Sequence, residues 1–356
     1  MVEHSLVDFR HADSHPAPKR LPGLDGLRAI SIGLVLICHS GGFGHEPPDF
    51  LISSTWLGLP SGRGKGAFGV EIFFVVSGYL ITHLLIAEES RFGSFDLRKF
   101  YLRRALRILP PAMVYLCCVT ILGLFGVFAL RPWDVIPCVF FFRNLTTGAA
   151  VTRHFWSLSI EEQFYLLWPM TLFFVRSSRA RIALIGALVG AAPFWRQINV
   201  IAFGAQYVNF WRIDLHYDPL LIGCGLALIR SSGVRMPAVL QSRYVPIVCL
   251  AGIIASLFWL GQLRVVRALS PSMSYFCVAT LINYVVEHPN GSIGTFLNYR
   301  WVVWLGALSY SLYIWQQLGF TLANHFGLAL IFTFAIATLS YYVVERPFNS
   351  LRNRFG

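Results

Sequence analysis

Charged residues are scarce in this sequence. Only 13% of its 356 residues are Asp, Glu, Lys or Arg, whereas 56% are hydrophobic, and the mean hydropathy is +0.60. A soluble domain carries about a quarter of its residues as charges. The shortage excludes an ordinary soluble domain and predicts that much of the surface faces hydrocarbon.

Three further patterns are missing. The net charge is +12, but no basic stripe with interleaved aromatic residues marks a nucleic-acid groove, so we expect no nucleic-acid partner. The seven cysteines form no C-x-x-C pair, which argues against zinc and thioredoxin-like chemistry, and we expect no metal site. The first 27 residues lack the apolar segment of a signal peptide, and residues 1–20 are predicted to be a polar cytoplasmic tail.

Long apolar stretches are abundant instead. A transmembrane helix needs roughly 20 apolar residues. We expect about ten spans, near 28–45, 67–87, 109–130, 157–176, 182–203, 215–230, 244–262, 270–288, 302–322 and 326–345. The apolar segment from Val135 to Phe142 is too short to cross and is predicted to be re-entrant or interfacial. The expected fold class is an all-α, polytopic membrane protein.

The basic residues predict the orientation of these spans. With the N-terminus inside, 20 of the 29 Lys and Arg residues fall in the inner connections and tails. This bias fits the positive-inside rule and places both termini in the cytoplasm. We expect one membrane domain over 21–348, with no internal repeat, and a cytoplasmic tail over 349–356.

The first predicted span begins at Arg28 and carries His39. They are eleven residues apart, so they share one helical face and are separated by about 16 Å along the axis. This spacing puts Arg28 at the cytoplasmic edge and His39 near the middle of the membrane. A neutral imidazole there is suited to accept a proton, and the alternative is a histidine whose nitrogens are satisfied by a neighbouring helix.

The second predicted span contains Ser77 and Gly78 at what we expect to be the depth of His39. Gly78 lets another helix or a substrate approach closely, and the alternative is a packing seam of small residues. The loop after this span is the most basic stretch, and Arg103 and Arg107 share a helical face there. Guanidinium groups bind phosphates well, although ordinary topogenic charge explains the same pattern.

The fourth predicted span carries a polar line formed by Ser157, Glu161 and Tyr165. A carboxylate at this position is costly unless it lines a cavity or belongs to a buried network. Other polar positions, at Asp214, His216, Asp218, Glu345 and Arg346, are expected to have structural roles.

These segments, taken in order, resemble the family 3 membrane acyltransferases. Arg28 and His39 match the family's Arg-x10-His signature, and Trp156-Ser157-Leu158 with Glu161 matches its Trp-Ser-Leu-x-x-Glu segment. The other matching residues are Phe73, Phe74, Ser77, Gly78 and Thr82, the loop residues Arg103, Arg104, Arg107 and Pro110, the run Ser309 to Tyr313, and the ending Glu345 to Phe348. The sequence departs from the family at His216, where members often have Arg, and at Gln316, where many have His. It has no appended esterase-like domain, so we expect a stand-alone member.

The resemblance implies a bacterial inner-membrane enzyme that transfers an acyl group, commonly acetyl, from cytoplasmic acyl-CoA to a hydroxyl of a sugar-containing acceptor. Such acceptors include lipopolysaccharide O-antigen and other envelope glycans. Acyl-CoA would be a co-substrate, with no cofactor bound permanently, and membrane lipids would surround the protein.

Each site residue then receives an expected role. His39 is the base, or alternatively an acyl-carrying nucleophile, and Glu161 orients His39 or binds acceptor hydroxyls. Arg103, Arg104 and Arg107 hold the coenzyme A phosphates, and Arg28 guides its entrance. Ser77, Gly78 and Thr82 line the thioester channel, and Trp156, Ser157 and Tyr165 contact the acceptor. A different class also fits these residues: a transporter or flippase that uses His39 and Glu161 as a proton relay.

Overall fold

The computed structural model describes residues 21–41, 67–203, 212–234, 236–258, 268–323 and 325–352. Within these ranges the regular elements are helices and no strand occurs, which confirms the all-α prediction. The α-helices are α1 (Leu24–Gly41), α3 (Ala67–Phe92), α4 (Leu97–Leu124), α5 (Pro132–Val139), α6 (Phe155–Phe174), α7 (Ser178–Phe203), α8 (Ile213–His216), α9 (Asp218–Ser231), α10 (Val245–Phe258), α11 (Ser270–Glu287), α12 (Ser292–Leu297), α13 (Arg300–Leu322), α14 (Phe326–Ser340) and α15 (Arg346–Arg352). Short 3-10 turns lie at Arg143–Leu145, Ala150–Thr152 and Ala238–Gln241, and a π-helical turn lies at Tyr341–Glu345.

Four helical segments in the described part of the chain are long and apolar enough to cross a membrane. They are Phe68–Phe92, Leu97–Leu124, Ser178–Phe203 and Phe326–Arg352, and the last joins α14, the π-helical turn and α15. The apolar helix Val245–Phe258 is shorter. These lengths and compositions support a membrane protein.

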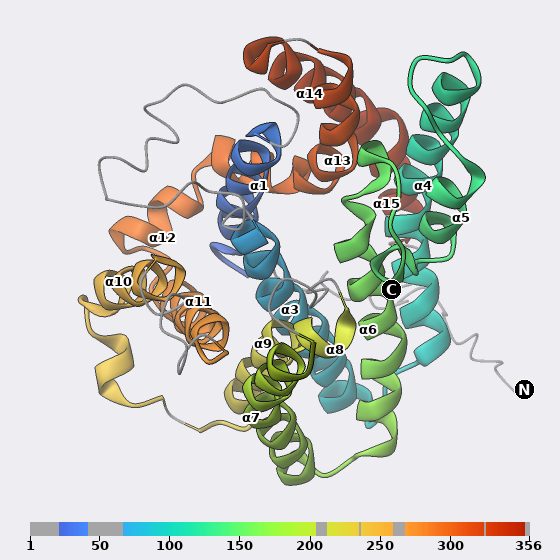
Figure 1. The fold of residues 1–356 in the computed structure, drawn as a ribbon. Helices are drawn as coiled ribbons and strands as arrows, with labels where there is room; N and C mark the ends of the chain where they lie inside the picture. Colours follow the sequence, from blue (N-terminus) through green and yellow to red (C-terminus); the bar gives the residue numbers. More distant parts are fainter. Residues whose placement is uncertain are drawn as a thin grey trace, which may run out of the picture.

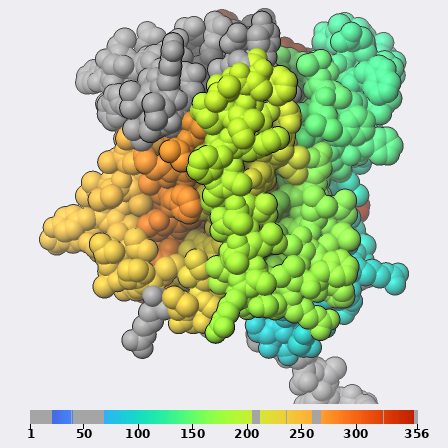
Figure 2. All heavy atoms as spheres, turned by 60° about the horizontal axis from the view of Figure 1, so that its bottom comes forward, coloured from blue at the N-terminus to red at the C-terminus, as the bar shows by residue number. Residues whose placement is uncertain are grey.

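The outer surface of the bundle is rich in large apolar side chains. On α7, Phe194 is 71% exposed and Ile201 74% exposed, and Figure 2 shows this helix outermost on one face of the molecule. Similar side chains cover the outward faces of α4, α6, α10 and α14. A soluble monomer rarely exposes so much contiguous apolar surface, whereas lipid tails solvate it well.

The core forms around α1 and α3, which lie in the middle of Figure 1 with α10 and α11 on one side and α4, α5 and α6 on the other. The tightest packing joins α3 to α9. A Cβ atom on Gly78 would lie 1.9 Å from the backbone oxygen of Leu220, and one on Gly223 would lie 2.1 Å from that of Val75. Gly78 is therefore part of a small-residue packing seam, the alternative that its sequence context left open.

The contacts between α1 and α3 correct the expected depths. Gly69, at the start of α3, packs against Ser31 and Val35 of α1, and the Ser31 hydroxyl donates to the Gly69 carbonyl. Ser77 lies eight residues after Gly69, whereas His39 lies four residues after Val35. Because the two helices run in opposite directions, Ser77 and His39 are roughly 18 Å apart along the axes. The prediction that they share one depth was wrong.

The two ends of the bundle differ in chemistry. Arg28 near the start of α1, Arg107 of α4 and Arg352 of α15 lie close enough for their charges to interact, together with Glu345. We call this the arginine end. The opposite end of α1, which carries His39, is the histidine end.

The short apolar segment predicted to be re-entrant or interfacial overlaps α5. The Asp134 carboxylate fixes this helix, because the backbone N–H groups of Arg131 and Ala149 donate to it over 2.8 and 2.7 Å. Burial raises the pKa of Asp134, but these hydrogen bonds outweigh it and hold the pKa below its ordinary value.

Candidate active site

His39 lies in the last turn of α1, where its side chain is half-buried and meets Gln316 of α13. The two atoms in contact are His39 Nδ1 and Gln316 Oε1, 3.1 Å apart. Gln316 is fully buried, and its amide nitrogen donates to the Tyr313 carbonyl over 3.1 Å. A buried glutamine held at both ends is a rigid partner for the imidazole.

A second histidine lies nearby. His154 precedes α6 and is 1% exposed, packed among the rings of Tyr115, Phe155 and Tyr313. His154 is close enough to His39 for the two charges to interact, and so is the exposed Arg153. These residues surround the histidine end with potential positive charge.

Further toward the arginine end, hydroxyl groups connect α6 to α13 and α3. Ser157 Oγ and the Tyr313 hydroxyl oxygen are 2.5 Å apart, and the Tyr313 hydroxyl donates to the His154 carbonyl over 2.8 Å. One helical turn on, Ser77 Oγ donates to Glu161 Oε1 over 2.8 Å, and the Tyr165 hydroxyl interacts with the same carboxylate. The predicted polar line on α6 is thus satisfied by neighbouring helices.

The arginines at the arginine end differ in whether they form an ion pair. Arg103 forms an ion pair with Glu88 over 2.9 Å. In the described ranges, Arg104 and Arg107 form no ion pair: the Arg104 guanidinium lies 3.7 Å from the centroid of the Tyr165 ring, and its Nε has no hydrogen-bond partner. Glu345 is 4% exposed, lies at the end of the π-helical turn and accepts a hydrogen bond from Ser311 over 2.8 Å. Turns of this type often occur at functional sites.

These groups follow one another through the bundle, and we call them the polar column. Its members, from the histidine end to the arginine end, are His39, Gln316, Tyr313, Ser157, Ser77, Glu161, Tyr165, Arg104 and Arg107. The charges of Arg104 and Arg107 also act on Glu161, so the members nearest the arginine end interact with one another.

Several predicted site residues have other contacts. Gly78 meets α9, and the fully buried Thr82 hydroxyl accepts from Trp168 Nε1 over 2.8 Å, so neither faces the column. Trp156 packs edge-on against Phe74 and His216. Arg28 lies 3.5 Å from Asp25 on the same helix and interacts electrostatically with Arg107. Glu161 bonds Ser77, and Gln316 takes the place beside His39 that we expected for Glu161.

Sequence reasoning missed three residues of this site. Gln316 was noted only as a departure from the family pattern, and Glu345 was expected to be structural. His154 was not singled out, although it stands directly before the Phe155-Trp156 pair. The available signal was a polar side chain in an apolar stretch, which gives no indication of its partner.

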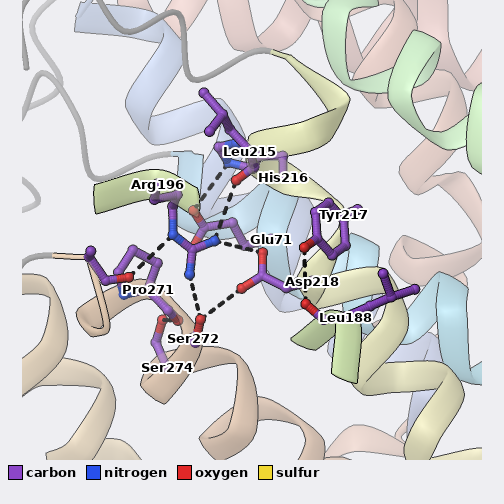
Figure 3. Close-up of polar contacts among 11 residues, drawn as sticks. Glu71, Leu188, Arg196, Leu215, His216, Tyr217, Asp218, Pro271, Ser272 and Ser274 are labelled. Atoms are coloured by element: carbon purple, nitrogen blue, oxygen red, sulfur yellow. Dashed lines mark hydrogen bonds and ion pairs between the residues drawn. The ribbon is translucent and has the colours of Figure 1, made fainter. Parts of the chain in front are cut away.

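A second buried polar cluster lies between α7, α9 and α11, shown in Figure 3. Arg196 forms an ion pair with Asp218 over 2.8 Å, and Ser272 donates to the other carboxylate oxygen over 2.7 Å. Arg196 also donates to Ser272 and to the carbonyls of Ala268 and Leu215. We call these five residues the Arg196 network. His216 lies beside it, with Nε2 3.8 Å from Glu71 Oε1.

The fold and site together define an α-helical membrane protein with charged and hydrogen-bonding groups aligned through its core. Comparison with known families is more specific. The model of the Acyl_transf_3 family, described as an acyltransferase domain, matches residues 21–344, and the chain belongs to this family. The resemblance stated from the motifs is confirmed.

Curated relatives agree with this assignment. The chain is 29% identical over 363 aligned residues to a putative peptidoglycan O-acetyltransferase, YrhL, of Bacillus subtilis, with 92% of the chain and 54% of the relative covered. It is 28% identical to the O-acetyltransferase OatA of Staphylococcus aureus, covering 96% of the chain and 59% of the relative. It is 25% identical to the peptidoglycan O-acetyltransferase OatA of Listeria monocytogenes, covering 92% and 56%. The chain therefore spans little more than half the length of these relatives, and no solved structure matches it.

Proposed function

We propose that this protein is a membrane O-acyltransferase that moves an acyl group, in the simplest case acetyl, from cytoplasmic acyl-CoA to a hydroxyl of an envelope glycan. The polar column carries this proposal. At one end lie Arg104 and Arg107, which form no ion pair within the described ranges, and at the other lies a hydrogen-bonded histidine.

The shape of the donor fits the separation between the arginines and His39. Acyl-CoA carries its phosphates and its thioester at opposite ends of a long molecule. Arg28 and His39 are about 16 Å apart on one helix, a distance that the extended pantetheine arm of acyl-CoA can span. Arg104 and Arg107 would bind the phosphates, because guanidinium groups suit phosphate geometry and, among the described residues, neither forms an ion pair.

The acceptor is proposed from the relatives. Two of them are named for peptidoglycan O-acetylation, which favours a peptidoglycan-type sugar over the lipopolysaccharide O-antigen that the motifs also allowed. Such a glycan lies outside the cytoplasm, so it would approach from the histidine end.

This arrangement requires a particular topology. We propose about ten spans in a bacterial inner membrane, with both termini and the arginine end in the cytoplasm. The excess of Lys and Arg in the inner connections supports this orientation. The proximity of α15 to the start of α1 supports an even number of spans, because a chain whose two ends lie on one side of a membrane crosses it an even number of times.

In the proposed reaction, His39 removes the proton from the acceptor hydroxyl as its oxygen attacks the thioester carbonyl. The carbon–sulfur bond then breaks, and coenzyme A leaves as a thiol after taking that proton from the His39 imidazolium, which restores the neutral base. Glu161, held by Ser77, lies between the arginines and His39 and would contact the donor along the column.

The test uses the protein in membrane vesicles with acetyl-CoA and a peptidoglycan fragment, measuring thiol release and acetyl-ester formation by mass spectrometry. General-base catalysis contributes about 100- to 10,000-fold, so His39→Ala should lose at least 100-fold in rate at unchanged abundance. The variant His325→Ala, on the loop before α14, is the matched control. Acetyl transfer by His39→Ala at the wild-type rate would refute the base assignment.

A further inference from the structure

We propose that Gln316 is a positioning residue that fixes the tautomer of His39, with the proton on Nδ1 and the lone pair on Nε2. This inference rests on the proposed role of His39 as a base. It adds which nitrogen does the chemistry and which residue decides it.

The orientation of the Gln316 side chain is the first step. Its amide nitrogen lies 3.1 Å from the Tyr313 backbone oxygen, which can only accept a hydrogen bond. Exchanging the two ends of the amide would bring two acceptor oxygens together. Gln316 is fully buried, so the neighbouring groups in the protein determine its orientation. Its Oε1 therefore faces His39.

The tautomer follows from this orientation. A carbonyl oxygen cannot donate, so the 3.1 Å contact between Gln316 Oε1 and His39 Nδ1 is a hydrogen bond only when Nδ1 carries the proton. The neutral ring then has its lone pair on Nε2, on the side of the ring away from Gln316. That nitrogen is the one available to take a proton from an acceptor hydroxyl.

The neutral charge of Gln316 also matters. Among the described residues, Arg153, before α6, opposes a positive charge on the His39 ring, and the buried His154 lies close enough for its charge to interact with that of His39. The Gln316 carbonyl stabilises the imidazolium as it forms, because a hydrogen bond to a charged group is stronger than one to a neutral group. A carboxylate at the same place would instead favour the protonated ring in the resting enzyme, and a protonated ring cannot act as a base.

The experiment compares two substitutions at Gln316 with one at its neighbour. Gln316→Met keeps the length and removes the acceptor, Gln316→Glu keeps the acceptor and adds a charge, and Gln317→Met is the control at an adjacent buried position. The measurements are abundance, kcat, the KM for acetyl-CoA and the pH–rate profile of acetyl transfer in vesicles.

Gln316→Met should lower kcat by roughly 10- to 100-fold, the usual effect of losing a group that orients a functional histidine, with the KM for acetyl-CoA within about twofold. Gln316→Glu should move the rising limb of the pH–rate profile to higher pH by about one unit and recover activity at alkaline pH, because the carboxylate still accepts from Nδ1. Gln317→Met should change neither kcat nor the profile. Wild-type kcat in Gln316→Met, or an unshifted profile in Gln316→Glu, would overturn the inference.

Nitrogen NMR of the wild-type protein with labelled histidine gives a readout that is independent of activity. The His39 signals, assigned by their loss in His39→Ala, should report a protonated Nδ1 and an unprotonated Nε2 at neutral pH, and the reverse pattern would contradict the proposal. If His39→Ala retains full activity, the proposed role of His39 as the base fails, and this inference fails with it. If His39→Ala is inactive while Gln316→Met and Gln316→Glu behave as wild type, only this inference fails.

Discussion

The polar column and the Arg196 network both hold charged groups inside the bundle, but their arginines differ in how many hydrogen-bond and ion-pair partners they have. In the network, Arg196 meets one carboxylate, one hydroxyl and two backbone carbonyls. In the column, Arg104 has an unpartnered Nε, and within the described residues Arg107 forms no ion pair. Among the described residues, the arginine of the network has its partners within the protein, whereas those of the column have fewer.

This difference separates structural charge from charge that awaits a ligand. Buried polar groups in folded proteins are almost always hydrogen-bonded, since leaving one unsatisfied costs about 1–3 kcal/mol. The Arg196 network meets this rule and joins α7, α9 and α11. In the part of the chain that the structure describes, Arg104 Nε does not meet it, and an anion such as the proposed acyl-CoA phosphates would supply the missing acceptor.

The largest expected effect is on stability, in the network. Asp218→Ala would leave the 4% exposed Arg196 without its carboxylate, and breaking a buried pair by removing one partner costs about 3–5 kcal/mol. We expect a strong loss of folded protein in the membrane, measured by abundance and thermal unfolding in detergent. The control is Asp214→Ala, which breaks the half-exposed pair with Arg212 and should cost about 1 kcal/mol or less. Equal stability of the two variants would remove the distinction between the regions.

The next effect is on donor binding, in the column. Arg107→Gln removes a cation that lies near Arg28, Arg104 and Arg352, so folding should not suffer, while the KM for acetyl-CoA should rise about tenfold. Arg103→Gln should raise this KM less, because Arg103 is already paired with Glu88. An unchanged KM in Arg107→Gln would indicate that the arginine cluster only determines topology and does not bind the donor.

The sequence predicted this contrast only in part. The helical class follows from the apolar stretches, and the costly charges that interrupt them single out Arg28, Arg107 and His39, whose proposed roles stay predictions. Relative depth did not follow, because the register between α1 and α3 depends on where Gly69 meets Ser31 and Val35.

Partner choice was equally hidden. The contact between His39 and Gln316 joins residues 277 positions apart. Glu345 is placed beside the arginines by one π-helical turn, which no periodicity of 3.6 residues anticipates. Such features depend on how the helices pack against one another. A single sequence shows which residue types can make contacts but not which residues contact each other.

The smallest effect expected is at Glu345, and it tests whether the arginine end is left open to anions. Glu345 is the carboxylate whose charge acts on Arg28, Arg107 and Arg352 together, and Ser311 holds it by a hydrogen bond. Glu345→Gln keeps the shape and the hydrogen bond but removes the negative charge that competes with a bound phosphate. We expect the KM for acetyl-CoA to fall about two- to threefold, with a steeper loss of binding as salt rises, since the donor then meets a less neutralised cluster. Ser311→Ala, which loosens Glu345 without changing charge, should leave the salt dependence as it is. A higher KM in Glu345→Gln would mean that Glu345 organises the arginines for the donor instead of competing with it.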